Sequence, residues 1–230
     1  MPTYFITGTD TDAGKTVVTG ALLALAARQG MTTLGLKPVA SGCRPESHGL
    51  RNPDAEVLQN HSRPEPDYDL VNPYAFEPAI APHLAARKAG IHLQLDDILA
   101  SLTLALAESR DLTLIEGAGG WRVPLNDDHD LADIATSLSL PVVLVIGMRL
   151  GAINHARLTA DAIRADGLAI AGWVANHMAP DFSERDANLA TLEYHLDAPC
   201  LGHVPYLGVD AGDRELARRA ADYLTLPGSD

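Results

Sequence analysis

Short apolar runs alternate with longer segments of helical periodicity along most of the chain. The apolar runs predict strands at residues 4–7, 33–37, 112–116, 142–146, 169–175 and, more weakly, 200–203. The periodic segments predict helices near residues 15–29, 95–109, 131–138, 153–165, 184–195 and 213–223. Strands that are apolar throughout are typical of a parallel sheet covered on both faces. We therefore expect one doubly wound α/β domain over residues 1–230, with a mostly parallel sheet and right-handed crossovers.

Residues 40–82 interrupt this alternation. They are rich in Pro, Asn, Asp and Arg and show little periodicity. Because the alternation resumes after them, we do not expect them to be a linker between domains. We interpret them as a long functional insertion that contains one helix near residues 54–60.

The composition narrows the classes of partner. The chain has 230 residues, of which 47% are hydrophobic, and a formal net charge of −13. This hydrophobic content suffices for a large core, while so negative a surface repels nucleic acid and anionic membranes. Cys43 and Cys200 show no disulfide or zinc spacing, and the sequence has neither a signal-peptide pattern nor an apolar run of about 20 residues. We expect a soluble, cytoplasmic protein that binds neither nucleic acid nor membrane.

The first predicted strand leads through a glycine-rich turn into a helix. Residues 7–16 read TGTDTDAGKT, so Gly14, Lys15 and Thr16 stand at the mouth of the helix. In such phosphate-binding loops, backbone N–H groups and the lysine bind phosphate oxygens, and the hydroxyl ligates Mg²⁺. Five residues rather than four separate Gly8 from Gly14, so the loop is a variant. A turn that merely joins strand to helix is the minor alternative. The motif predicts a P-loop NTPase-like fold and a bound nucleoside triphosphate, but no particular reaction.

Ligands of open α/β sheets lie beyond the carboxyl ends of the strands, and a carboxylate stands at one such end. Glu116 ends a predicted strand and precedes the glycine-rich residues 117–120. P-loop proteins hold Mg²⁺ with a carboxylate at this place, although Asp is more usual than Glu. Alone, the motif fits an ordinary strand end equally well. In combination with Lys15 and Thr16, the metal interpretation is favoured.

Lys37, Ser41 and Asp54 follow the second predicted strand. Lys37 could face a transferred phosphate, Ser41 a polar substrate, and Asp54 the metal. Taken separately, Lys37 is better explained as a solvated lysine beside a proline turn, and Asp54 as a helix N-cap.

Later segments present further candidates. Residues 151–154 begin a helix, whose N–H groups favour a carboxylate, and simple capping explains them equally well. Asn176 ends a late strand, and its amide can pair with a purine edge, although a structural Asn is favoured if the loop is ignored. Residues 202–206 follow another strand, and no guanine-specific Asn-Lys-x-Asp motif occurs.

Together these blocks resemble the dethiobiotin synthetase family of ATP-dependent ligases. The matching segments are residues 7–16, 37–42, 72–74, 116–121, 150–156 and 171–176. The resemblance implies that 7,8-diaminononanoate, CO₂ and ATP become dethiobiotin, ADP and phosphate through a carbamate and a carbamic–phosphoric anhydride. It also implies Mg²⁺ as cofactor, ATP as co-substrate, and a homodimer with sites at the subunit interface.

The resemblance assigns roles by position. It implies catalytic roles for Thr11, Lys15, Lys37 and Ser41. The implied nucleotide-binding residues are Asp12, Ala13, Gly14, Lys15, Thr16, Val17, Glu116, Gly117, Gly119, Asn176, His177, Val204, Pro205 and Tyr206. The implied metal ligands are Thr16, Asp54 and Glu116. The implied substrate contacts are Ser41 and, across the subunit interface, Gly151, Ala152 and Asn154. Asp12 stands where the family often has Glu, and its shorter side chain reaches less far.

Two other classes of protein use a related loop. Partitioning and septum-positioning ATPases act as switches through partner binding, and this is the main alternative. They typically carry a further lysine near the start of the loop, where this chain reads Gly8-Thr9-Asp10. Amidoligases of cofactor synthesis usually carry a glutaminase domain, for which this chain is too short.

Overall fold

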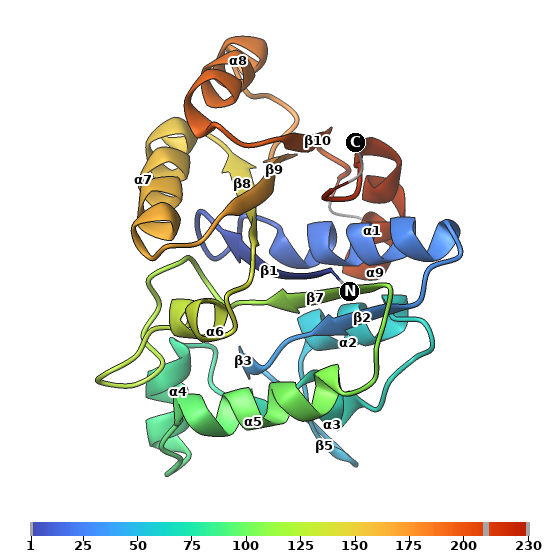
Figure 1. The fold of residues 1–230 in the computed structure, drawn as a ribbon, viewed down its shortest axis with the longest axis vertical. Helices are drawn as coiled ribbons and strands as arrows, with labels where there is room; N and C mark the ends of the chain where they lie inside the picture. The colour runs from blue at the N-terminus through green and yellow to red at the C-terminus, as the bar shows by residue number, and fades with distance from the viewer. Residues whose placement is uncertain (1, 209–211, 229–230) are drawn as a thin grey trace.

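A six-stranded parallel sheet forms the centre of the protein (Figure 1). The computed structural model describes residues 2–208 and 212–228. The strands are β1 (Thr3–Gly8), β2 (Thr33–Leu36), β7 (Leu112–Glu116), β8 (Val142–Met148), β9 (Ile170–His177) and β10 (Cys200–Val204), in the order β10-β9-β8-β1-β7-β2. The predicted parallel sheet is confirmed, including its weakest strand, β10.

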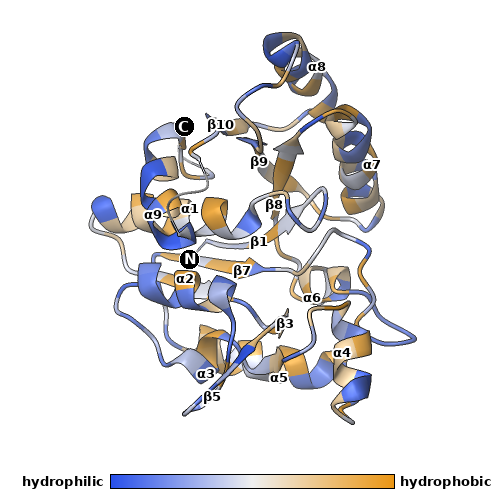
Figure 2. Ribbon diagram, turned by 180° about the vertical axis from the view of Figure 1, so that it is seen from behind, coloured by the Kyte–Doolittle hydropathy of each residue, from blue (hydrophilic) through white to orange (hydrophobic). Residues whose placement is uncertain are grey.

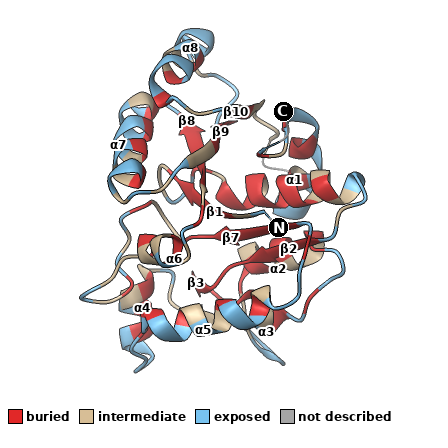
Figure 3. Cartoon of the chain, in the orientation of Figure 1, coloured by how far each residue is buried: buried red, intermediate tan, exposed pale blue. Residues whose placement is uncertain are grey.

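Both faces of the sheet are buried, which explains why its strands are apolar throughout (Figure 3). In β1, Ile6 belongs to the hydrophobic cluster on one face, and its neighbour Phe5 belongs to the cluster on the other. The same division separates Val143 from Leu144 in β8. Successive side chains of a strand point to opposite faces, so a sheet with two covers needs apolar residues at every position.

Helices cover the two faces as layers. One layer contains α1 (Lys15–Arg28), α2 (Pro53–His61) and α9 (Asp213–Ala220), and the other contains α5 (Leu95–Leu106), α6 (Ala132–Ser137), α7 (Ala152–Ala165) and α8 (Arg185–Leu196). The exposed residues of α7 and α8 are mostly polar, whereas the strands between the layers are apolar (Figure 2). A short 3₁₀ helix, η1 (Ala221–Tyr223), completes the segment predicted as one helix. None of the described helices is both long and apolar enough to cross a lipid bilayer.

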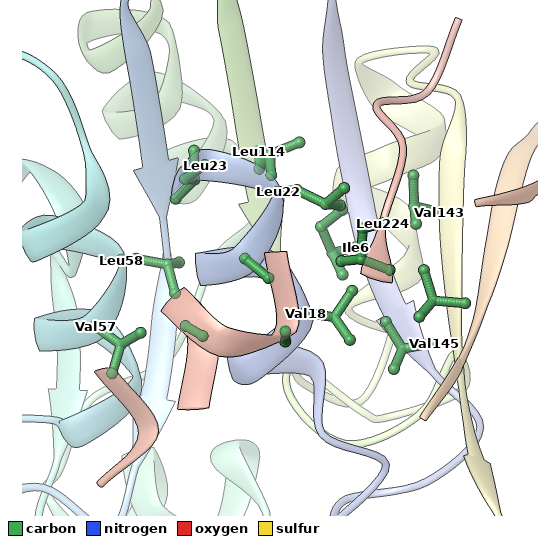
Figure 4. Close-up of a cluster of buried hydrophobic side chains, with 14 of the residues drawn as sticks. Ile6, Val18, Leu22, Leu23, Val57, Leu58, Leu114, Val143, Val145 and Leu224 are labelled. Carbon is green, nitrogen blue, oxygen red and sulfur yellow. The ribbon is translucent and has the colours of Figure 1, made fainter. Parts of the chain in front are cut away.

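Helix α1 packs against the sheet and also against α2 and α9. Leu22 and Leu23 of α1 are fully buried and lie in one cluster with Leu58 of α2 and Leu114 of β7 (Figure 4). Contact on several sides explains why α1 is apolar around most of its circumference. The helix that begins at the phosphate-binding loop is therefore held rigidly against the sheet.

The insertion at residues 40–82 contains more regular structure than the single predicted helix. Strand β3 (Val39–Ser41) pairs in parallel with β6 (Tyr74–Phe76), and β4 (Arg44–Glu46) forms a hairpin with β5 (Gly49–Arg51). The insertion contains the helices α2 and α3 (Tyr68–Val71), and α4 (Pro82–Lys88) begins at its last residue. The prediction missed these additional elements because most are three or four residues long, too short to show a period.

Close packing of β2 against α1 and α2 gives a test of the core. We expect Gly35→Ala to lower the free energy of unfolding by about 1–3 kcal/mol, because overpacking displaces neighbouring side chains. A Cβ at residue 35 would lie 2.6 Å from Leu23 Cδ1 and 3.0 Å from Leu58 Cβ. As a control, Gly212→Ala places a Cβ where no atom of the described residues lies within 4 Å. Urea unfolding curves measure both variants, and equal losses would contradict this account.

Candidate active site

A cavity of about 860 Å³ lies at the carboxyl ends of the central strands. Most of the predicted site residues line it. They are Thr11, Asp12, Gly14, Lys15, Thr16, Val17, Lys37, Ser41, Asp54, Gly119, Asn176, His177, Val204, Pro205 and Tyr206. The structure thus brings together residues that the sequence separates by up to 195 positions.

The phosphate-binding loop is held from two sides. Gly14 has a φ of 85°, the left-handed conformation that glycine adopts at no steric cost, and it forms the N-cap of α1. The carbonyl of Ala13 accepts a hydrogen bond from Asn176 Nδ2 at 3.0 Å. Lys15 Nζ donates to the carbonyl of Asp10 at 3.0 Å. The loop is therefore shaped before a ligand binds, and Asn176 links it directly to the end of β9.

Lys15 lies in an environment that disfavours its charge. Burial, together with repulsion from the Lys37 ammonium, lowers the pKa of Lys15 to about 8, although Glu116, Asp54 and Asp10 oppose the shift. A phosphate placed at the loop would add negative charge beside this ammonium and favour its protonated form.

Lys37 and Glu116 form a buried ion pair at the ends of adjacent strands. Leu36 of β2 pairs with Ile115 of β7, so the next residue on each strand is brought to the same edge. Lys37 Nζ lies 2.7 Å from Glu116 Oε1, and it also donates to the carbonyl of Gly117 at 3.0 Å. Both side chains are almost completely buried, so the interpretation of Lys37 as a solvated lysine is wrong.

Asp54 joins this pair from the insertion. Its Oδ2 lies 3.1 Å from Lys37 Nζ. Burial alone would raise the pKa of Asp54, but the Lys37 ammonium and hydrogen bonds from Lys37 and Thr16 hold that pKa below its ordinary value. The N-cap interpretation of Asp54 is wrong, because the side chain of Asn52 caps α2 by accepting from the N–H groups of Asp54 and Ala55.

Two carboxylates therefore hold the Lys37 ammonium in its charged form. Burial lowers the pKa of Lys37, but attraction to Glu116 and Asp54 outweighs that cost and raises the pKa above its ordinary value. The backbone is fixed as well, since Asn72 Nδ2 donates to the carbonyl of Lys37 at 2.7 Å. This ammonium therefore stays protonated near neutral pH and places a positive charge at this edge of the sheet.

Three oxygen donors near the loop fit a magnesium ion. The Thr16 hydroxyl donates to Glu116 Oε1 at 2.9 Å, which leaves its lone pairs for another partner. Asp54 and Glu116 supply two carboxylates, and among the described residues no group of three or more His, Cys, Asp or Glu side chains could hold a metal. Mg²⁺ is typically bound by one or two carboxylates, waters and substrate phosphates, so this donor set suits it.

Residues that end or follow the late strands also line the cavity. They are Asn176, His177, Val204, Pro205 and Tyr206, all of which the sequence identifies as candidates. The prediction missed several further lining residues, which are Met178, Leu207, Asp213 and Leu216. Burial, and then repulsion from Asp54 and Glu116, raises the pKa of Asp213. The sequence of α9 contains no recognisable site motif. Only the folded structure shows that α9, packed against α1, contributes residues to the cavity.

Several predicted residues do not line this cavity. Glu116 and Gly117 accept hydrogen bonds from Lys37, and the carbonyl of Ala13 accepts one from Asn176. Gly151, Ala152 and Asn154 lie at the start of α7, where Gly151 is the N-cap with a φ of 95°. Just before them, Arg149 forms an ion pair with Asp10 of the phosphate-binding loop. The turn therefore adjoins the loop but contributes nothing to the cavity of its own chain.

Thr19 is a site residue that the sequence motifs did not indicate. Its hydroxyl lies 2.7 Å from Glu116 Oε2. The sequence contained one indication of this role: Thr19 lies three residues after Thr16 and four after Lys15, which places all three on one face of the helix. That spacing becomes informative only once Glu116 is known to lie opposite.

Comparison with known proteins shows extensive sequence similarity to proteins named ATP-dependent dethiobiotin synthetase. A family model described as an AAA domain matches residues 2–210. The chain is 62% identical over 236 residues to the ATP-dependent dethiobiotin synthetase BioD of Chromohalobacter salexigens, covering 99% of each chain. It is 56% identical over 207 residues to the protein of the same name from Pseudomonas aeruginosa, covering 90% of this chain and 91% of that one.

Solved structures show the same fold at low sequence identity. The septum site-determining protein MinD from Pyrococcus horikoshii, complexed with Mg-ADP, is 18% identical with a TM-score of 0.54. The alignment covers 98% of this chain and 87% of that one. The similarity confirms the predicted P-loop NTPase-like fold, and at this identity it indicates the fold alone.

The fit of Gly14 against Asn176 gives a test of the site. A Cβ at residue 14 would lie 2.0 Å from Asn176 Nδ2. We expect Gly14→Ala to weaken ADP binding tenfold or more, about 1.4 kcal/mol, because both the loop and Asn176 must move. Gly30→Ala is a matched control, since Gly30 has a similar φ of 81° with no atom of the described residues within 4 Å of its Cβ. Calorimetric titration with ADP compares them, and equal losses of affinity would contradict the clash.

Proposed function

The chain belongs to the family of ATP-dependent dethiobiotin synthetases, and we propose that the cavity between the phosphate-binding loop and Lys37 is where it performs this reaction. The enzyme is an ATP-dependent cyclo-ligase that joins 7,8-diaminononanoate and CO₂ into the ureido ring of dethiobiotin and releases ADP and phosphate. The observation that carries the assignment of the site is that Lys15, Lys37 and Ser41 line one cavity and that Lys37 is paired directly with Glu116.

The reaction requires three bond-forming steps. One amine of the diamine attacks CO₂ and loses a proton, which gives a carbamate. A carbamate oxygen then attacks the γ-phosphorus of ATP, and ADP leaves. Finally the second amine attacks the carbamoyl carbon and loses a proton, the C–O bond breaks, and phosphate leaves with closure of the ring. None of these steps needs a nucleophile from the protein, so its task is to position the reactants and stabilise charge.

We assign these tasks to residues of the cavity. Lys15 binds the β- and γ-phosphates at the N-terminus of α1. The Lys37 ammonium faces the carbamate and the transferring phosphoryl group, where a positive charge lowers the barrier most. Thr11 and Ser41 contact the diamine or carbamate, and the burial of Lys37 keeps its charge from being screened by water.

We assign the magnesium ion and the adenine of ATP to two different sets of residues. We propose that Thr16, Asp54 and Glu116 hold Mg²⁺, which would neutralise phosphate charge during transfer. Asn176, with Pro205 and Tyr206, holds the adenine, and its amide is kept in place by the carbonyl of Ala13. Asp12 lines the cavity but has a second-rank role, because its side chain is short and exposed.

We also propose a homodimer in which the start of α7 completes the site of the other subunit. Residues 151–154 lie outside the cavity of their own chain, and their N–H groups suit a substrate carboxylate. Leu150, just before α7, is 98% exposed, and Leu158, in the middle of α7, is 61% exposed, as expected for a surface that another subunit covers. The free cysteines Cys43 and Cys200 fit a reducing compartment, so we propose that the enzyme lies in the cytoplasm. We also propose that the chain forms a single ligase domain.

The switch ATPase alternative is not favoured. Its supporting observation is fold similarity at 18% identity, whereas the ligases are 62% and 56% identical over most of the chain. The two functions differ in whether ATP consumption depends on a small diamine or on a macromolecular partner.

Diamine dependence is therefore the decisive measurement. We expect Mg·ATP and bicarbonate to give ADP and dethiobiotin only when 7,8-diaminononanoate is present, as measured by coupled ADP release and mass spectrometry.

Lys37→Met should lower turnover by about 10²–10³-fold, the cost of removing one preorganised charge, while ADP binding changes little. The exposed Lys88→Met is its control. ADP release without the diamine, and no dethiobiotin, would refute the assignment.

A subunit-mixing experiment tests the shared site. Lys37→Met removes the charge from one cavity, and Asn154→Asp adds a repulsive charge at the start of α7. If each site uses both subunits, a refolded equimolar mixture should recover about a quarter of wild-type activity, because half of the dimers are mixed and each has one intact site. Activity no higher than the mean of the two variants would show that the sites are not shared.

A further inference from the structure

Thr19 occupies an unusual place for a helix threonine. It lies on α1, one turn after Lys15, and its side chain is completely buried. The hydroxyl lies 2.8 Å from the carbonyl of Lys15 and 2.7 Å from Glu116 Oε2. It has a single proton for these two acceptors, and the carboxylate is the stronger because it is charged.

The two oxygens of Glu116 have different partners. Oε1 accepts from Thr16 at 2.9 Å and from Lys37 at 2.7 Å, on the side of the cavity. Oε2 accepts from Thr19 at 2.7 Å, on the side of α1. Hydrogen bonds to both oxygens fix the rotation of the carboxylate, and the Thr19 bond directs Oε1 toward Thr16 and Lys37.

We propose that Thr19 is a positioning residue that orients Glu116 for Mg²⁺ and thereby sets the metal affinity of the site. The inference rests on the proposed role of Glu116 as a metal ligand. Side chains that hydrogen-bond to metal ligands typically change metal affinity 10–100-fold when they are removed. Because Thr19 is itself a residue of α1, its hydrogen bond ties the carboxylate to the helix that carries the phosphate-binding lysine.

A purely structural role for the hydroxyl is the competing explanation. Threonines within helices often bond to the carbonyl four residues earlier, and such a bond needs no carboxylate. The two explanations differ in what they predict for the metal. A structural hydroxyl affects only stability, whereas a positioning hydroxyl changes the Mg²⁺ concentration that the site requires.

The test uses Thr19→Val, which keeps the shape of the side chain and removes the hydroxyl. ADP binding to the full-length enzyme is measured by titration calorimetry over a series of Mg²⁺ concentrations, with thermal unfolding recorded in parallel. We expect the half-saturating Mg²⁺ concentration to rise about 10–100-fold in Thr19→Val and to stay near the wild-type value in Thr19→Ser. If Thr19→Val does not fold, Thr19→Cys, a weak donor of similar size, should give an intermediate value.

Thr33→Val is the matched control. Thr33 is also completely buried, and its hydroxyl donates to the carbonyl of His61 at 3.2 Å, away from the cavity. It should lose stability without any change in Mg²⁺ dependence. A Thr19→Val enzyme that melts at a lower temperature but keeps the wild-type Mg²⁺ midpoint would overturn the inference. A wild-type enzyme whose ADP binding ignores Mg²⁺ would instead refute the proposed metal role of Glu116.

Discussion

The buried ion pair between Lys37 and Glu116 is the interaction on which the site depends. Removing two charges from water is costly, and a buried pair is weak evidence for stability. Here the cost is offset by several hydrogen bonds: Glu116 accepts from Thr16 and Thr19, and Lys37 donates to the carbonyl of Gly117. The arrangement keeps a positive charge and a carboxylate preorganised at one sheet edge. We infer that the pair serves the site rather than the stability of the fold.

The order of the strands makes this pair possible. Strand β7 lies between β1 and β2, so the carboxyl ends of three strands bring the phosphate-binding loop, Lys37 and Glu116 to the same edge. The insertion places Asp54, on α2, beside Lys37, and α9 contributes further residues to the lining of the cavity. Packing of α1 on several sides keeps Lys15, Thr16 and Thr19 in register with Glu116, so the core supports the chemistry directly.

How far the sequence predicted the molecule differed between its parts. The central strands and the helices between them were predicted because each is long enough to show a period or a continuous apolar run. The elements of residues 40–82 were mostly missed, because three-residue strands carry no such pattern. The phosphate-binding loop and Glu116 were identified from local motifs. Judged alone, Lys37 was expected to be solvated and Asp54 to be a helix N-cap. Both expectations were wrong because the partners of Lys37 lie as far as 79 residues away in the sequence.

The sequence by itself determined the fold class, the nucleotide loop and the family, since these depend on periodicity and on contiguous motifs. The tertiary structure decided which side chains are charged, buried and paired. It placed Lys37 between two carboxylates, gave the cap of α2 to Asn52, put Thr19 against Glu116, and left the start of α7 outside the cavity of its own chain. The physical reason is that a side chain's charge and burial depend on neighbours from distant segments, and only the folded chain brings those segments together.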